Sequence, residues 1–211
     1  MKTSQMFLAA SAALLFGASA AAQGPARVIG TVDLAPSGYV LRELEDRGIA
    51  TDSVLDLSEF LLESADLLGN FVTDPIDGSI RFVVESAEEA EAVFEAEFEA
   101  EVDPDLPGPA IGILEMGVEV LGPATFFVFA TPGTSCTPLL SYAPNVEGTW
   151  WLGTSSILTL DGGSMFDLWE VALVVPQDPA LAGLELNLQA AVHQDPAPLL
   201  FLNAQKVVLW P

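Results

Sequence analysis

Residues 86–102 read SAEEAEAVFEAEFEAEV, and the structure of this stretch decides the fold class. Alanine and glutamate favour a helix, and Ser86 with Glu89 matches the capping box of a helix N-terminus. The periodicity favours a strand, because apolar residues alternate with glutamates from residue 94 to residue 102. A helix would scatter the same glutamates around its axis. We therefore predict a strand from about residue 93, preceded at most by one helical turn.

Short apolar segments separated by turn residues continue from residue 71 onward. Turn residues gather at Asp77-Gly78, residues 103–109, residues 161–163 and Asp178-Pro179. Strands are expected at residues 79–85, 93–102, 111–121, 124–130, 148–153, 156–160, 167–175, 184–192 and 199–209, the last with a potential break near Asn203. This pattern predicts a mainly β fold, an antiparallel β-sandwich or jelly-roll-like domain over residues 71–211.

The segment 184–192 indicates which face of a predicted strand is buried. Apolar residues occupy every second position, and polar residues stand at positions 185, 187 and 189. Such alternation separates the two faces of a strand. We expect Leu184, Leu186, Leu188, Ala190 and Val192 to point inward, and Glu185, Asn187 and Gln189 to point outward.

Residues 23–70 show a different spacing, which predicts an acidic helical segment before the β domain. Ser37 is placed to cap a helix over residues 38–47, which Gly48 would end in a left-handed conformation. A second helix, capped at Asp52 or Ser53, would stop at Gly69. Its apolar residues recur three and four positions apart at Val54, Leu57, Leu61, Ala65 and Leu68.

The start of that second helix also resembles the calcium loop of dockerins and EF-hands. Asp52, Asp56 and Glu59 fall at the fifth, ninth and twelfth positions of such a loop. The first and third ligand positions, however, hold glycine and alanine, and serine replaces the glycine of the sharp turn. We therefore favour a capped helix over a calcium loop.

Residues 1–22 have the organisation of a secretory signal peptide. Lys2 gives a basic start, an apolar run follows from Met6 to Phe16, and small residues end at Ala22. The run is shorter than the roughly 20 residues of a membrane-spanning helix, and no second long apolar run follows. Cleavage is expected before Gln23, which predicts a secreted or periplasmic protein.

Cys136 is the single cysteine, so no intramolecular disulfide can form despite the predicted export. The thiol would be either reactive, or in an intermolecular bridge, or a small buried group beside a turn. Cysteine is among the most frequently buried residues, so we favour the buried group. The stability of the fold must then come from burial of its apolar side chains.

Charge excludes one class of partner. The chain has 30 acidic and 6 basic residues, a net charge of −24, and removal of Lys2 with the signal peptide would make the net charge −25. Such a surface repels nucleic acid, which proteins bind through clustered lysine and arginine, and it disfavours docking on anionic lipid. Disorder is not expected, because 51% of residues are apolar, including 12 phenylalanines and 4 tryptophans.

The glutamate row is the first candidate for a binding role. On a strand, Glu95, Glu97, Glu99 and Glu101 would lie on one face about 6.5–7 Å apart. Bound Ca²⁺ would relieve their repulsion, as in extracellular calcium modules. The alternative, which we favour, is a solvated acidic face that keeps the protein soluble and prevents pairing of sheet edges.

Motifs of enzymes are mostly absent, and we assign no catalytic, cofactor-binding or metal-binding residue. His193 is the single histidine and is expected to decorate a strand end. The Gly-x-Ser sequences lack the second glycine of a nucleophile elbow, no phosphate loop is present, and one histidine with one cysteine cannot build a usual zinc site. Paired carboxylates of a hydrolase have no sequence motif and stay an alternative.

The tryptophans are a second candidate for a binding role. They would form either a platform for stacking sugars or, as we favour, parts of the core: Trp150, Trp151, Trp169 and Trp210.

The last third of the chain carries a further pattern. It comprises PGTSCTPLL at residues 132–140, NVEGTWWLG at 145–153, VPQDPALAGLELNLQAAV at 175–192, and Leu202-Asn203-Ala204. Over about residues 131–210 the chain resembles the C-terminal β-rich module of uncharacterised secreted proteins from planctomycete-type bacteria. The resemblance implies export and a β fold, and it implies no catalytic residues.

These observations predict a secreted, highly acidic, non-catalytic binding or surface-structural protein. A calcium-assisted carbohydrate-binding module is the first alternative, with Ca²⁺ or a polysaccharide or surface partner. An extracellular hydrolase with paired carboxylates is the second alternative.

Overall fold

The computed structural model describes residues 24–45, 48–101, 111–133, 139–140, 146–152 and 156–210. The expected signal peptide and Cys136 lie outside these residues. No helix in this part of the chain is long and apolar enough to cross a membrane.

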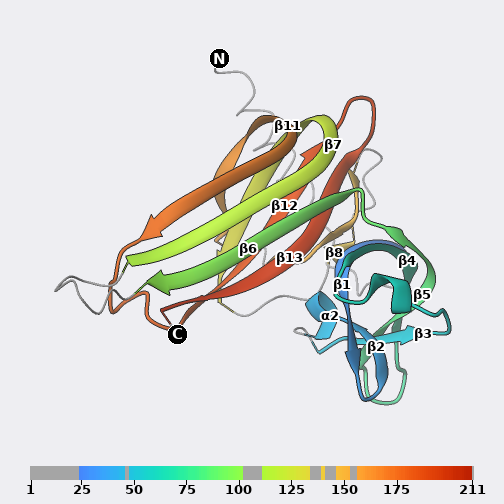
Figure 1. The fold of residues 1–211 in the computed structure, drawn as a ribbon. Helices are drawn as coiled ribbons and strands as arrows, with labels where there is room; N and C mark the ends of the chain where they lie inside the picture. Colours follow the sequence, from blue (N-terminus) through green and yellow to red (C-terminus); the bar gives the residue numbers. More distant parts are fainter. Residues whose placement is uncertain are drawn as a thin grey trace.

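The described residues form a mainly β fold, as predicted, arranged as two curled sheets (Figure 1). The first sheet has the strand order β2-β1-β4-β5-β3, and the second has the order β11-β7-β12-β13-β9, with β6 also paired to β7. The first contains β1 (Gly24–Ala35), β2 (Gly38–Leu41), β3 (Ala50–Ser53), β4 (Ser64–Thr73) and β5 (Ile80–Glu89). The second contains β6 (Ala92–Glu101), β7 (Ile111–Pro132), β9 (Val146–Glu147), β11 (Leu158–Val175), β12 (Leu184–His193) and β13 (Leu199–Leu209). A short pair, β8 (Leu139–Leu140) with β10 (Thr149–Trp150), lies beside them.

The helical pair expected in residues 23–70 is wrong. The described helices there are one turn, α2 (Arg42–Glu45), and a 3₁₀ turn, η1 (Ser58–Phe60). Leu61, Ala65 and Leu68 fit a helical period, but residues 64–73 form β4, in which Ala65, Leu67 and Phe71 are buried on one face. Backbone pairing of β4 with the distant strand β1 on one edge and with the following strand β5 on the other overrides the local spacing. Residue 70 therefore lies within a strand, and the two sheets meet at residues 90–91.

The described part of this stretch, residues 86–101, lies in strands except at residues 90 and 91, as its periodicity predicts from residue 93 onward. β6 covers residues 92–101, but no helical turn precedes it, because residues 86–89 complete β5 by pairing with β4. The capping-box residues Ser86 and Glu89 thus lie opposite Leu68 and Ala65 in a sheet.

The second sheet closes almost completely into a barrel, instead of the expected sandwich. One edge of β7 pairs with β11, and its other edge pairs first with β6 and then with β12. β12 pairs with β13, and β13 lies beside β6. Register shifts at residues 160 and 167 of β11 mark bulges, which increase the twist and bend a sheet. The first sheet is also curled, so that its edge strands β2 and β3 contact each other. The parallel pairs β3–β5 and β9–β13 make both sheets mixed, not purely antiparallel.

The seam between β6 and β13 is held by a side-chain amide. The Phe94 N–H donates to Asn203 Oδ1 at 2.8 Å, and Asn203 Nδ2 donates to the Phe94 carbonyl at 2.7 Å. Asn203 is fully buried, and it stands where a bulge separates the Gln189 and Ala191 pairings of β12 with β13. The break expected near Asn203 is thus a bulge within a continuous strand.

Most other predicted strands of the β domain match the structure, with two fusions. Residues 111–121 and 124–130 belong to the single strand β7, and residues 156–160 and 167–175 both fall largely in β11. Asp161-Gly162-Gly163 was predicted to be a turn but continues β11. A Cβ on Gly162 would lie 2.8 Å from the Phe127 ring, so glycine serves here for close strand approach.

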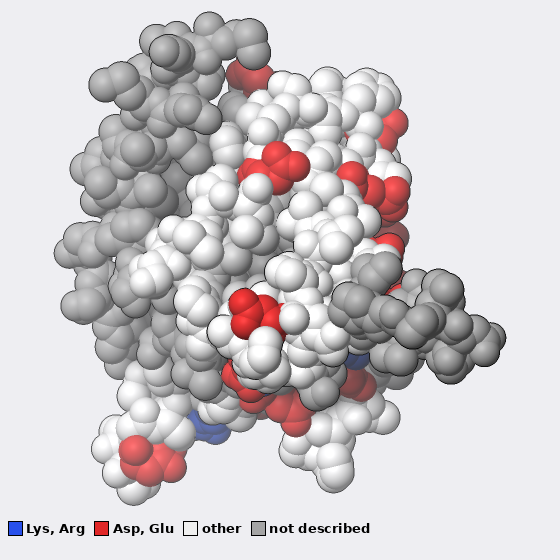
Figure 2. All heavy atoms as spheres, turned by 90° about the vertical axis from the view of Figure 1, so that its left-hand side faces the viewer, with Lys and Arg blue, Asp and Glu red and all other residues white. Residues whose placement is uncertain are grey.

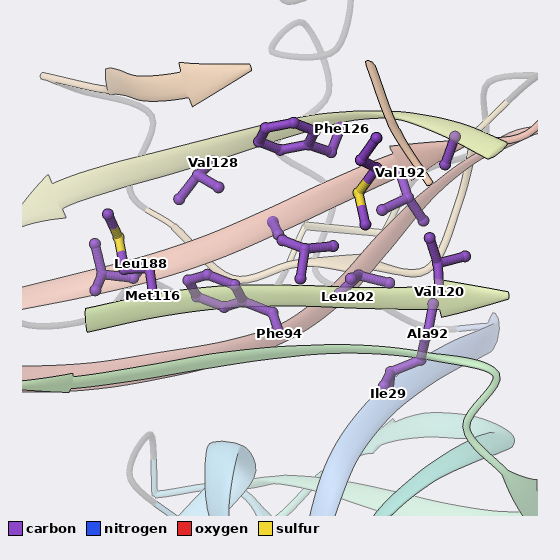
Figure 3. Packing of buried hydrophobic residues seen from close by; sticks show 14 of the residues in the cluster. Ile29, Ala92, Phe94, Met116, Val120, Phe126, Val128, Leu188, Val192 and Leu202 are labelled. Atoms are coloured by element: carbon purple, nitrogen blue, oxygen red, sulfur yellow. The ribbon is translucent and has the colours of Figure 1, made fainter. Parts of the chain in front are cut away.

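The barrel interior holds the larger core. Figure 3 shows side chains of β6, β7, β12 and β13 converging there, among them Phe94, Met116, Leu188 and Leu202. Ile29 of β1 belongs to this core, whereas Trp151 and Ala204 pack in the core of the first sheet. The two sheets therefore share a packed interface.

The two faces of β12 are not divided into a buried and an exposed face as predicted. Leu188, Ala190 and Val192 face the barrel core, as predicted, and Leu186 packs against it. Asn187 and Gln189 are also buried, because the opposite face of β12 is covered. Ala191 on that face packs with Trp150 and Leu152.

Candidate functional site

An acidic surface lies on the outside of the barrel, where β6, β7 and β11 run side by side. Phe94, Ala96 and Phe98 of β6 face the core, which leaves the glutamates between them exposed. The same alternation exposes two glutamates of β7 and one of β11. We call these residues the outer acidic surface: Glu95, Glu97, Glu99, Glu115, Glu119 and Glu170.

The strand register brings like charges together on this surface. Glu97 lies directly opposite Glu115, and Glu95 and Glu170 lie on either side of Gly117. Opposed like charges on neighbouring strands destabilise a sheet. The sequences of β6, β7 and β11 contain no lysine or arginine, so these strands supply no basic partner. The view in Figure 2 shows acidic groups spread over the molecule, with basic groups visible only in its lower part.

β11 forms the border of this surface, and one of its edges is open. Within the described residues β11 pairs with β7 only. Met165 is its single buried residue in the described chain, and several large apolar side chains are exposed, including Phe166 at 69% and Val174 at 74%. Figure 1 shows β11 on the side of the barrel away from the first sheet. An edge strand presents unpaired backbone N–H and C=O groups to solvent.

No group of three or more His, Cys, Asp or Glu side chains in the described part of the chain converges to hold a metal ion. The acidic residues of the calcium-loop interpretation are separated. Asp56 accepts hydrogen bonds from the Tyr39 hydroxyl at 2.6 Å and from the Ser58 N–H at 3.0 Å, which lowers the pKa of Asp56 and raises the pKa of Tyr39. Asp52 forms an ion pair with Arg81 at 3.9 Å.

The other sequence candidates occupy structural positions. His193 ends β12 and is exposed, as expected of a residue at a strand end. Trp150 and Trp151 are buried in two different cores, which confirms the core interpretation for these two. Trp169 packs against Phe126, and Trp210 packs edge-on against Phe98. The four rings do not line one platform.

The buried polar side chains hold the fold. Gln189 accepts from the Trp151 N–H at 2.9 Å and donates to the carbonyls of Thr149 and Leu202, each at 2.8 Å. The Glu43 carboxylate accepts from the Thr31 N–H at 2.9 Å and from its hydroxyl at 3.2 Å. Hydrogen bonds of this kind satisfy groups that burial would otherwise penalise.

Arg27 joins the two sheets through charge. Its Nε donates to both carboxylate oxygens of Asp66, at 3.0 and 2.9 Å, and another guanidinium nitrogen contacts Glu147. These hydrogen bonds, chiefly the one with Asp66, raise the pKa of Arg27. Thr149 Oγ1 also donates to the Arg27 carbonyl at 2.9 Å. Arg27 is therefore committed to the interface between the first sheet and residues 146–150.

Sequence reasoning found the glutamate row but not the open strand beside it. Apolar residues predominate in residues 168–175, which indicates a strand, but apolar content does not reveal whether a strand is central or at an edge. The absence of lysine and proline between residues 158 and 175 was the available signal, since natural edges are often protected by them.

Comparison with family models, with curated proteins and with solved structures found no match to this chain. The resemblance of residues 131–210 to secreted planctomycete-type proteins stays a prediction.

Proposed function

We propose that this chain is an exported, highly acidic, non-catalytic binding or surface-structural protein, and that it binds through the outer acidic surface. The observation that carries the proposal is the combination of exposed glutamates and an open, apolar strand edge on one side of the barrel.

Electrostatics supports a cationic ligand for this surface. The Glu97–Glu115 opposition lowers stability when the face is solvated, and a bound cationic group would replace that repulsion with attraction. The buried amides of Gln189 and Asn203 are already engaged with backbone groups. The polar groups that remain accessible for recognition on the barrel are thus largely carboxylates.

Export is supported by the predicted signal peptide and by the position of β1. The first described strand begins at Gly24, so cleavage before Gln23 would leave every described strand intact. The intact mass of the exported protein tests this part of the proposal. Material that starts at Gln23 supports it, and exported material that retains Met1 contradicts it.

Binding is tested with immobilised polylysine as the probe and the mature chain in solution. The first variant carries Glu97→Gln, Glu115→Gln and Glu119→Gln. The matched control carries Glu63→Gln, Glu88→Gln and Glu89→Gln, which changes the net charge equally at exposed positions in β5 and just before β4. Salt is varied from about 0.01 to about 0.1 M, over which the Debye length falls from about 30 to about 10 Å.

We expect salt-sensitive binding that the first variant weakens more than the control does. Equal weakening by both variants would show that net charge alone governs binding, and it would contradict a localised site. Hydrolysis of a glycoside panel by the purified protein, lost when carboxylates are replaced, would overturn the non-catalytic part of the proposal.

A further inference from the structure

The segment Leu168–Val175 of β11 has an edge that no described strand pairs with, and its two faces lie in different surroundings. It follows the bulge at Asp167 and pairs without interruption with Glu119–Gly112 of β7. Leu168, Glu170, Ala172 and Val174 share the outer face with the glutamates of β7, because directly opposed residues lie on one face of a sheet. Trp169, Val171 and Val175 pack against the barrel core on the other face.

The usual protections of a sheet edge are scarce in this segment. It contains no lysine and no proline, it has no register shift, and Glu170 is its single charged residue. Leu168 is 51% exposed and Val174 is 74% exposed. An exposed, uninterrupted apolar edge of this kind is a template for another strand.

We propose that Leu168–Val175 binds an extended segment of a basic partner protein, which adds to the barrel as a further β-strand and alternates basic with apolar residues. The proposal rests on the proposed function, and it specifies the partner of the same surface. Main-chain hydrogen bonds to β11 would supply affinity, and alternate side chains would supply specificity.

The register determines where the basic residues belong. A residue opposite Glu170 on the added strand would face the row that contains Glu170, Gly117 and Glu95. A lysine or arginine opposite Ala172 would meet a small side chain, and Glu115 is the next residue along that row. Alternate residues of the partner would lie on the other face, beside Trp169, Val171 and Leu173, and these positions favour apolar side chains.

Charge disfavours a second copy of the chain as the occupant. Antiparallel pairing of two β11 strands would bring two outer acidic surfaces together, and β11 offers no basic residue to compensate. The whole chain has 6 basic residues and contains no stretch in which they alternate with apolar residues. The partner must therefore supply the positive charge.

The experiment uses the mature chain and a capped peptide of alternating lysine and valine, equal in length to the open segment. Two further peptides have the same sequence but carry N-methyl groups on alternate residues, one set for each edge of the strand. Strand addition uses one peptide edge only, so one methylated peptide should lose affinity by about tenfold or more while the other still binds. Amide exchange should slow in residues 168–175 when the unmodified peptide is bound.

Protein variants separate backbone pairing from charge. Glu170→Gln should weaken peptide binding roughly two- to fivefold at low salt, and the matched change Glu88→Gln on the first sheet should leave it unchanged. Equal affinity for both methylated peptides, or slowed exchange elsewhere than in β11, would overturn strand addition and leave the proposed function standing. Failure of this peptide and of polylysine to bind would contradict both proposals, and dimerisation through β11 without peptide binding would replace the partner with a second copy.

Discussion

β12 and β11 both pair with the second half of β7, yet their surroundings are opposite. β12 is paired on both edges, and residues 187–192 are buried on both faces. β11 is paired on one edge among the described residues, and most of its side chains are exposed. Similar apolar content therefore serves different ends. In β12 the apolar side chains stabilise the barrel core, and in β11 many of them are exposed to solvent.

The largest contrast between the strands is expected from the same truncation in each. Leu188→Ala in β12 removes a fully buried side chain from the barrel core, which should cost about 2–5 kcal/mol of unfolding free energy. Leu168→Ala in β11 removes a side chain that is 51% exposed, and it should cost less than about 1 kcal/mol. Denaturant unfolding measures both, and equal losses would abolish the distinction.

A second comparison replaces a side-chain amide in two settings. Gln189→Leu removes the side-chain amide that bonds to the Trp151 backbone N–H and to two buried carbonyls, and each buried hydrogen bond lost should cost about 1–3 kcal/mol. Gln194→Leu removes an exposed bond to the Leu121 carbonyl, which water can replace. Urea unfolding should show a large loss for the first variant and a change of less than about 0.5 kcal/mol for the second. A tolerated Gln189→Leu would mean that these amides do not hold the covered face of β12.

The outer acidic surface allows a smaller test on the open side of the barrel. Glu97→Gln removes the direct opposition with Glu115 and should raise stability by about 0.2–1 kcal/mol at low salt. Glu99→Gln is the control, since Glu99 lies opposite Ile113. The melting temperature of the parent should rise between about 0.01 and about 0.1 M NaCl, and Glu97→Gln should reduce that rise. Identical salt responses of parent and variant would show that the glutamates act independently.

The smallest effect concerns an exposed carboxylate that does have a partner. The Tyr39 hydroxyl lowers the pKa of Asp56, so this hydrogen bond stabilises the fold at pH values above the usual carboxyl pKa of about 4. That stabilisation is lost as the pH falls through the folded-state pKa of Asp56. Asp56 raises the pKa of Tyr39, so the same hydrogen bond stabilises the fold at pH values below the usual tyrosine pKa of about 10. That stabilisation is lost as the pH rises through the folded-state pKa of Tyr39.

Tyr39→Phe should therefore lower the melting temperature slightly between about pH 5 and about pH 9, and the difference from the parent should vanish at both extremes. A difference that persists in acid would assign the effect to packing of the ring.

Local patterns were sufficient for strands whose alternation agrees with their tertiary pairing. Residues 92–101 are the best example, because Phe94, Ala96 and Phe98 face the barrel core. Residues 184–193 form the predicted strand, but their polar face is buried as well. The spacing of Leu57, Leu61, Ala65 and Leu68 misled, since one sequence can fit a helical period while long-range pairing with β1 selects a strand. Tertiary pairing overrides local preference in such cases.

Local sequence patterns could not predict that the barrel closes or that β11 is an edge strand. Closure depends on β7 pairing with both β6 and β12, and on Asn203 bonding to Phe94 across a separation of 109 residues. The edge position of β11 depends on the same strand order. Alternation predicted the acidic face of β6, but only the register showed that Glu97 and Glu170 belong to one surface with β7.

Amide hydrogen exchange of the free protein tests the contrast between β12 and β11 most directly. Half of the amides in an edge strand point away from its partner, so alternate amides of residues 168–175 should exchange rapidly. Amides of residues 187–192 should exchange only through global unfolding, because both edges and both faces of β12 are covered. Protection of every amide in residues 168–175 to the level of β12 would show that the edge is already paired, and it would contradict the open binding strand.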